Sequence, residues 1–60
     1  MTFRKIRKIL ISNGFDNIIP ARSDHIKFYN KAGIHVSIPY RKEVNDMLWK
    51  RIVKENNLII

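Results

Sequence analysis

Two histidines, His25 and His35, carry the only imidazole groups among the 60 residues of the chain. A histidine side chain has an ordinary pKa of about 6.5, so it donates or accepts a proton readily near neutral pH. Lys27 and Tyr29 follow His25 at alternate positions, and Arg22 precedes it. Because alternate residues of a β-strand lie on one face, this spacing predicts an imidazole, a cation and a phenol in one row.

Other common catalytic arrangements are missing from the sequence. It contains no cysteine, no glycine-rich phosphate loop and no paired carboxylates, and no carboxylates accompany the histidines at a metal-ligand spacing. Ser23, Asp24 and His25 are consecutive, so on a strand they point to alternate faces and cannot form a serine–histidine–aspartate relay. We therefore expect neither a metal site nor a cofactor.

The charge of the chain is strongly positive. Twelve Lys and Arg residues oppose five Asp and Glu residues, which gives a formal net charge of +7. A field of this size favours a polyanionic partner, either a nucleic acid or an acidic protein. The apolar segments are too short to span a bilayer, and the basic residues near the N-terminus lie within an apolar period, unlike those of a signal peptide. We expect a cytoplasmic protein.

RNA suits this combination of one imidazole and many cations. It carries its own nucleophile, the 2′-hydroxyl, and one general acid or base typically contributes on the order of 10² to 10⁴ in rate. His25 could take that role while Lys27 and Arg22 stabilise charge on the phosphate. Tyr29 and Tyr40 are the better candidates for base stacking. The alternative for His25 is an ordinary surface histidine on a strand.

The elements that must position these residues follow from periodicity. Helical spacing of apolar residues predicts a helix over 2–13, with Thr2 as N-cap and a stop at Asn13-Gly14, and a second helix over 44–56. Residues 15–22 are expected to form an edge strand because Pro20 removes a ladder donor. Trp49, Phe3 and Phe28 fall in apolar stripes and are expected in the core.

A hairpin should carry His25. Apolar and polar residues alternate over 25–29 and over 34–38, which predicts two half-buried strands. A loop over 31–33 that ends in Gly33 joins them. This loop sets Phe28 opposite Val36, keeps Ile34 and the other large aliphatic residues on one face, and leaves His25 on the other. The order helix, three strands, helix predicts an α+β domain over 1–60, a three-stranded antiparallel sheet with two helices on one face.

A set of short motifs along the whole chain resembles the HicA family of toxin–antitoxin systems. The matching residues are Asn13-Gly14-Phe15, Ser23-Asp24-His25-Ile26-Lys27-Phe28, Ile38-Pro39, and Lys42-Glu43-Val44 with Leu48, Ile52 and Val53. The resemblance implies a fold like the double-stranded RNA-binding domain and an mRNA-cleaving activity that arrests growth. It also implies catalysis by His25 and neutralisation by a cognate antitoxin of the HicB type.

Three functions stay open at this point. The leading hypothesis is a ribosome-independent, metal-independent endoribonuclease toxin with His25 as general acid or base. Arg22, Lys27 and Tyr29 would then contact the RNA. The second is a non-catalytic RNA-binding module, for which the same charge and fold suffice. The third is an interaction partner of an acidic antitoxin whose activity on RNA has decayed.

Overall fold

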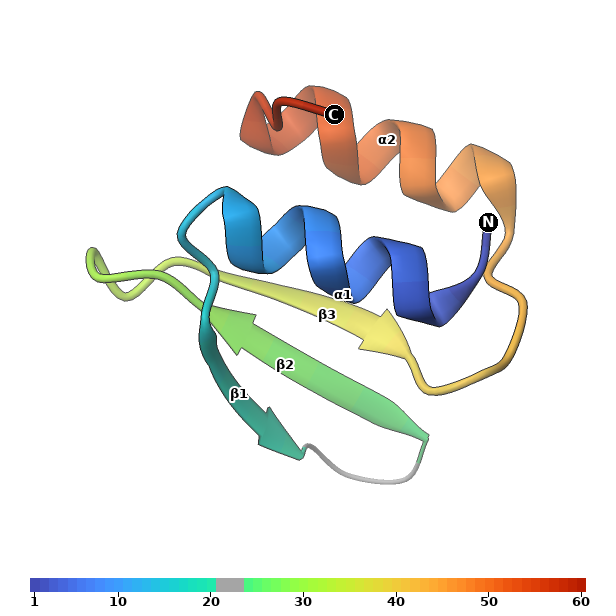
Figure 1. Ribbon diagram of the computed structural model, residues 1–60, viewed down its shortest axis with the longest axis horizontal. Helices are drawn as coiled ribbons and strands as arrows, with labels where there is room; N and C mark the ends of the chain where they lie inside the picture. Colours follow the sequence, from blue (N-terminus) through green and yellow to red (C-terminus); the bar gives the residue numbers. More distant parts are fainter. Residues whose placement is uncertain (21–23) are drawn as a thin grey trace.

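The computed structural model describes residues 1–20 and 24–60, which form five elements (Figure 1). In chain order they are α1 (Phe3–Ser12), β1 (Asn17–Pro20), β2 (His25–Tyr29), β3 (His35–Pro39) and α2 (Asp46–Asn56). The expected α+β class and α-β-β-β-α order are confirmed. The three strands form one antiparallel sheet in the order β1-β2-β3, so β2, which begins with His25, is the central strand.

The first helix begins and ends where its sequence indicates. The Thr2 side chain accepts a hydrogen bond from the backbone N–H of Lys5 at 3.3 Å, as an N-cap does. Gly14 has a φ of +91°, a left-handed conformation that suits glycine just after a helix. Between these ends, Ile6 and Leu10 are fully buried against the rest of the protein.

The β2–β3 hairpin has the register expected from its loop. Phe28 pairs with Val36 and Lys27 with Ser37. Gly33 closes the loop with a φ of +80°. The Asn30 side chain accepts hydrogen bonds from two N–H groups of this turn at 2.9 and 3.0 Å. Because a shift of one residue would turn the apolar side chains outward, this turn also fixes which face carries His25.

The predicted edge strand is confirmed but is shorter than expected. It covers Asn17–Pro20, whereas the sequence indicated 15–22. Phe15 lies before the strand and is buried in the core. The last two residues of the expected strand, Ala21 and Arg22, lie outside the described residues. The strand pairs with β2 along its whole length, with Ile18 opposite Phe28.

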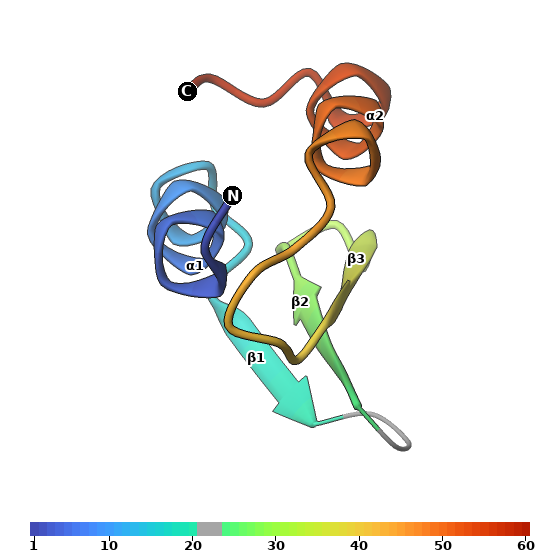
Figure 2. The same ribbon diagram turned by 90° about the vertical axis from the view of Figure 1, so that its right-hand side faces the viewer.

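Both helices lie on the same side of the sheet (Figure 2). The core between them and the strands contains Phe28 and Ile38 from the sheet, Ile6 and Leu10 from α1, and Trp49 and Ile52 from α2. Neither helix of the described chain is long and apolar enough to cross a membrane. Neither helix of the described residues lies over the opposite face of the sheet (Figure 2).

Two expectations about apolar positions are corrected. Ile34 lies 53% exposed rather than with the core, because it adjoins the hairpin loop, which extends past the ends of both helices (Figure 1). The second helix starts at Asp46 rather than Val44. The side chain of Asn45 caps it by accepting hydrogen bonds from the N–H groups of Met47 and Leu48 at 2.8 and 3.2 Å. Val44 is nevertheless buried.

The start of α1 is tied to the connection between β3 and α2. Thr2 and Glu43 form an isolated antiparallel bridge. The amino group of Met1 donates to Asp46 Oδ1 at 2.6 Å and to Glu43 Oε2 at 3.1 Å. These hydrogen bonds raise the pKa of the amino group, Asp46 contributing most, and the same bond lowers the pKa of the Asp46 carboxyl. The N-termini of α1 and α2 are therefore held together at one end of the sheet.

Candidate active site

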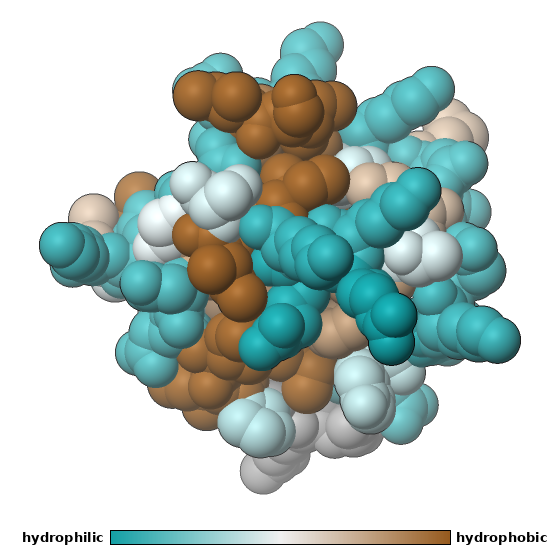
Figure 3. Space-filling model, viewed as in Figure 1, coloured by the Kyte–Doolittle hydropathy of each residue, from teal (hydrophilic) through white to brown (hydrophobic). Residues whose placement is uncertain are grey.

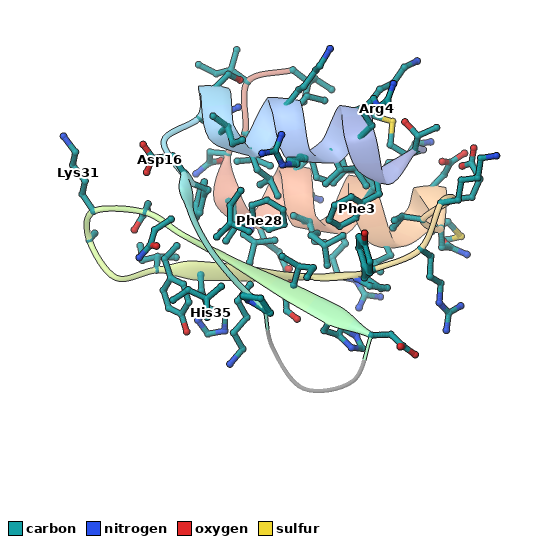
Figure 4. The ribbon with its side chains drawn as sticks, turned by 60° about the horizontal axis from the view of Figure 1, so that its bottom comes forward. Phe3, Arg4, Asp16, Phe28, Lys31 and His35 are labelled. Carbon is teal, nitrogen blue, oxygen red and sulfur yellow. The ribbon has the colours of Figure 1, made fainter. Side chains whose placement is uncertain are left out.

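The open face of the sheet collects the polar residues that the alternation predicted there. We call it the open face and define it by the outward residues of the three strands, which are Asn17, Ile19, His25, Lys27, Tyr29, His35, Ser37 and Pro39. Figure 4 shows His35 projecting on this side, away from the helices, whereas Phe28 lies between the sheet and α1. The open face thus differs sharply in chemistry from the buried face.

His25 is the first residue of β2 and is exposed on the open face. It pairs with Pro39 in the β2–β3 ladder. Within residues 1–20 and 24–60, no hydrogen bond involves either nitrogen of its imidazole. Both nitrogens are therefore free to meet a ligand from solvent as far as the described residues are concerned.

Lys27 follows His25 by two residues in β2 and lies on the same face. It lies between Ile19 of β1 and Ser37 of β3 in the register, and it is half-buried. Such burial is typical of a lysine whose aliphatic stem covers neighbouring side chains while its ammonium stays in water. Two residues of strand separate the backbones of Lys27 and His25 by about 7 Å. A phosphate group can bridge side chains at that separation.

Tyr29 forms a second cluster, farther along the strand. Its ring lies beside the His35 ring with centroids 5.2 Å apart and planes inclined by 37°. Four residues of strand, about 13 Å, separate Tyr29 from His25. The register therefore places His25 and Lys27 at neighbouring positions of the open face, whereas Tyr29 contacts His35. Arg22, the other candidate phosphate contact, lies outside the described residues.

The described part of the chain contains no group of three His, Cys, Asp or Glu side chains that could hold a metal ion. The side chains of the open face can supply proton transfer by an imidazole and charge stabilisation by an ammonium. Both act on anionic oxygen atoms such as those of phosphates.

Sequence reasoning missed one arrangement at the edge of the molecule. Tyr40 was a candidate for stacking, but its position beside Phe3, with ring centroids 5.2 Å apart, was not expected. Arg4 and Arg41 line a hollow around this pair. The contact depends on the long-range bridge between Thr2 and Glu43, for which the sequence carries no local signal.

Comparison with protein-family models, with curated proteins and with solved structures finds no match to this chain.

Proposed function

We propose that the protein is a ribosome-independent endoribonuclease that cleaves mRNA and arrests growth, a toxin of the HicA type. The observation that carries this proposal is the exposed imidazole of His25 beside Lys27 on the open face of a protein with a net charge of +7. A polyanion would be drawn to such a surface. The motif resemblance to HicA toxins adds the substrate class and the biological effect.

The reaction uses the nucleophile of the RNA itself. The 2′-oxygen forms a bond to the adjacent phosphorus while the bond from phosphorus to the 5′-oxygen breaks. The 2′-hydroxyl loses its proton and the 5′-oxygen gains one, which leaves a 2′,3′-cyclic phosphate and a 5′-hydroxyl. His25 acts as general base or general acid in this step, and the ammonium of Lys27 stabilises the charge that grows on the phosphate oxygens. No metal ion takes part in this scheme.

The distance between the histidines argues for a single catalytic imidazole. His35 pairs with Tyr29 at the other end of the β2–β3 ladder, whereas His25 pairs with Pro39. That places the two histidine backbones about 13 Å apart along the strands, too far to act on opposite sides of one phosphate. The second proton is therefore exchanged with water or with Lys27.

A cognate antitoxin of the HicB type would neutralise this activity. The support is the charge of the chain, which an acidic protein complements, and the open face, which a partner could cover and so block His25. Binding would also stabilise a small domain through linkage, because the partner binds only the folded state.

A non-catalytic RNA-binding module is the second candidate. The observation that favours it is the lack of any hydrogen bond that orients the His25 imidazole within the described residues. Many catalytic histidines are held by such a bond. In this case the open face would bind RNA without cleaving it.

Expression in cells separates the candidates. The wild type, His25→Ala and His35→Ala are induced without an antitoxin, and growth and RNA integrity are scored. The toxin hypothesis expects growth arrest and RNA cleavage with the wild type and His35→Ala, and normal growth with His25→Ala. Normal growth and intact RNA with the wild type, at equal protein levels, would overturn it.

A further inference from the structure

A hollow lies at the end of the molecule where α1 begins and the chain leaves β3. We name it the Tyr40 cleft and define it by its lining residues, which are Thr2, Phe3, Arg4, Tyr40, Arg41 and Lys42. A second hollow shares Phe3, Arg4 and Tyr40 with it and is also lined by Arg7, Ile18, Ile26 and Phe28. Tyr40 thus borders two adjoining hollows, each lined by cations.

The backbone fixes the two sides of the Tyr40 cleft against each other. The N–H of Phe3 donates to the carbonyl of Lys42 at 3.2 Å, beside the Thr2–Glu43 bridge. The N–H of Tyr40 donates to the carbonyl of Asp24, which extends the β2–β3 ladder past His25. Tyr40 is therefore one residue beyond the partner of His25, and the cleft and His25 lie at the same end of the sheet.

The ring of Tyr40 packs against another aromatic ring and is nevertheless largely exposed to solvent. It meets the Phe3 ring edge to face, with centroids 5.2 Å apart and planes at 80°. Phe3 in turn contacts the buried Phe28, with ring centroids 6.1 Å apart, and Figure 4 shows these two rings between α1 and the sheet. Tyr40 itself remains 66% exposed. An aromatic ring held from one side and exposed on the other can stack a planar group.

Among the described residues, the charged ones that line the Tyr40 cleft and the adjoining hollow are all cations. Arg4, Arg41 and Lys42 line the cleft, and Arg7 lines the adjoining hollow. Asp24, which accepts the backbone hydrogen bond from Tyr40, lines neither hollow. The nearby carboxylates of Glu43 and Asp46 bind the amino group of Met1 instead. On the face drawn in Figure 3, hydrophobic surface lies directly beside strongly hydrophilic side chains. This combination suits a ligand with flat apolar parts and repeated negative charge.

We infer that the Tyr40 cleft binds an unpaired nucleotide of single-stranded RNA. The base stacks on the Tyr40 ring, and Arg4, Arg41 and Lys42 contact the flanking phosphates. Proteins bind single-stranded nucleic acids with a basic groove and with aromatic side chains on which the bases stack. The bases of an A-form duplex are not available for such stacking. An acidic peptide would satisfy the cations but would leave the exposed ring without a planar partner.

This inference rests on the proposed function in taking RNA as the ligand, and it adds a substrate preference. Tyr40 points to the helix side of the sheet and His25 to the open face, because their backbone positions differ by one step of the alternation. A strand that passes over the end of the β2–β3 ladder contacts both. The Tyr40 cleft would then direct cleavage to unpaired RNA.

Binding is measured in a His25→Ala background, so that the RNA stays intact. The probe is an eight-nucleotide single-stranded RNA, and its binding is measured by fluorescence anisotropy. A duplex of the same sequence serves for comparison. Tyr40→Ala should weaken binding of the single strand by about 5- to 150-fold, the loss expected for one base stack. Tyr40→Phe keeps the ring and should bind like the parent, as should Met47→Ala, which changes an exposed apolar residue on α2.

The cations are tested by salt dependence. Arg41→Ala should lower the slope of log affinity against log salt by about 0.7, the contribution of one phosphate contact to a single strand. Lys54→Ala removes an exposed lysine near the end of α2 and should leave the slope unchanged. Amide shifts on titrating RNA into the His25→Ala protein locate the site even if a Tyr40 variant fails to fold.

The outcomes separate this inference from the proposed function. If the folded Tyr40→Ala variant binds the single strand as tightly as its parent, RNA binding at the Tyr40 cleft is contradicted. Amide shifts that leave Arg4, Tyr40 and Arg41 unaffected would contradict it as well. Neither result bears on cleavage by His25. RNA binding that depends on Tyr40, in a protein whose wild type does not cleave, supports the cleft and contradicts the nuclease. If the protein binds poly-glutamate in a Tyr40-dependent way but does not bind RNA, the cleft is a site for an acidic protein and the RNA inference is wrong.

Discussion

His25 pairs with Pro39 at the end of the β2–β3 ladder, and Tyr40, the next residue, bonds to the backbone of Asp24. This relationship places an exposed imidazole at the edge of the open face, next to the point where the chain turns toward α2. Phosphates that approach this edge meet Lys27 on the same face.

The fully buried ring of Phe28 should dominate the stability of the domain. It is 0% exposed and lies between β1, β3 and α1. Phe28→Ala should lower the free energy of unfolding by about 3–5 kcal/mol, as large-to-small core substitutions do. The change in the free energy of unfolding is measured by urea denaturation, with the fluorescence of the buried Trp49 as the signal. Ile34→Ala, at an exposed apolar position, is the control and should stay within about 0.5 kcal/mol of the wild type.

Gly33 should be replaceable only at a conformational cost. Its φ is +80°, and a Cβ atom built there would meet nothing within 4 Å. The cost of Gly33→Ala is therefore the left-handed conformation alone, about 1–2 kcal/mol. Gly33→Asn should lose less, because asparagine tolerates this conformation better. Equal thermal stability of all three proteins would show that the hairpin does not depend on this turn.

The contact between the Met1 amino group and Asp46 should give stability a defined pH window. The pKa of Asp46 is lowered from 3.8, so its contribution is present above that pH and is lost as pH falls through the folded-state value. The pKa of the amino group is raised from 8.0, so its contribution is present below that pH and is lost as pH rises through the folded-state value.

The difference in melting temperature between the wild type and Asp46→Asn should therefore be largest between about pH 4 and pH 8. Both groups are exposed, so the difference should be small. Acetylation of the amino group removes its charge and should reduce the pH dependence in the wild type. A difference that stays constant from pH 3 to pH 10 contradicts this pairing.

Lys27 should affect cleavage more than folding. Lys27 lies two residues from His25 on the open face, and a hydrogen bond to a charged group is worth about 1.5–3 kcal/mol. We therefore expect Lys27→Met, which keeps the aliphatic stem, to slow cleavage by about 10- to 100-fold, with little change in melting temperature. Lys27→Arg keeps the charge and should retain most of the activity. Lys31→Met, in the exposed hairpin loop, is the matched control and should cleave normally.

Local sequence patterns predicted the elements better than their contacts. The strands, the loop and the open face followed from alternation around Gly33, because a period of two and a turn leave one register that buries Phe28. The start of α2 was misplaced because Val44 fits both a helical stripe and the core. The contact between Phe3 and Tyr40 could not be predicted, since it depends on a pairing between distant segments.

The measurement that tests the central claim most directly is the rate of RNA cleavage by purified wild type, His25→Ala and His35→Ala in excess EDTA. Single-stranded RNA in excess enzyme gives a first-order rate constant, and melting temperatures confirm that each variant is folded. We expect the wild type and His35→Ala to cleave at similar rates without metal, and His25→Ala to be slower by about 10² to 10⁴. Cleavage by His25→Ala at the wild-type rate would contradict the account.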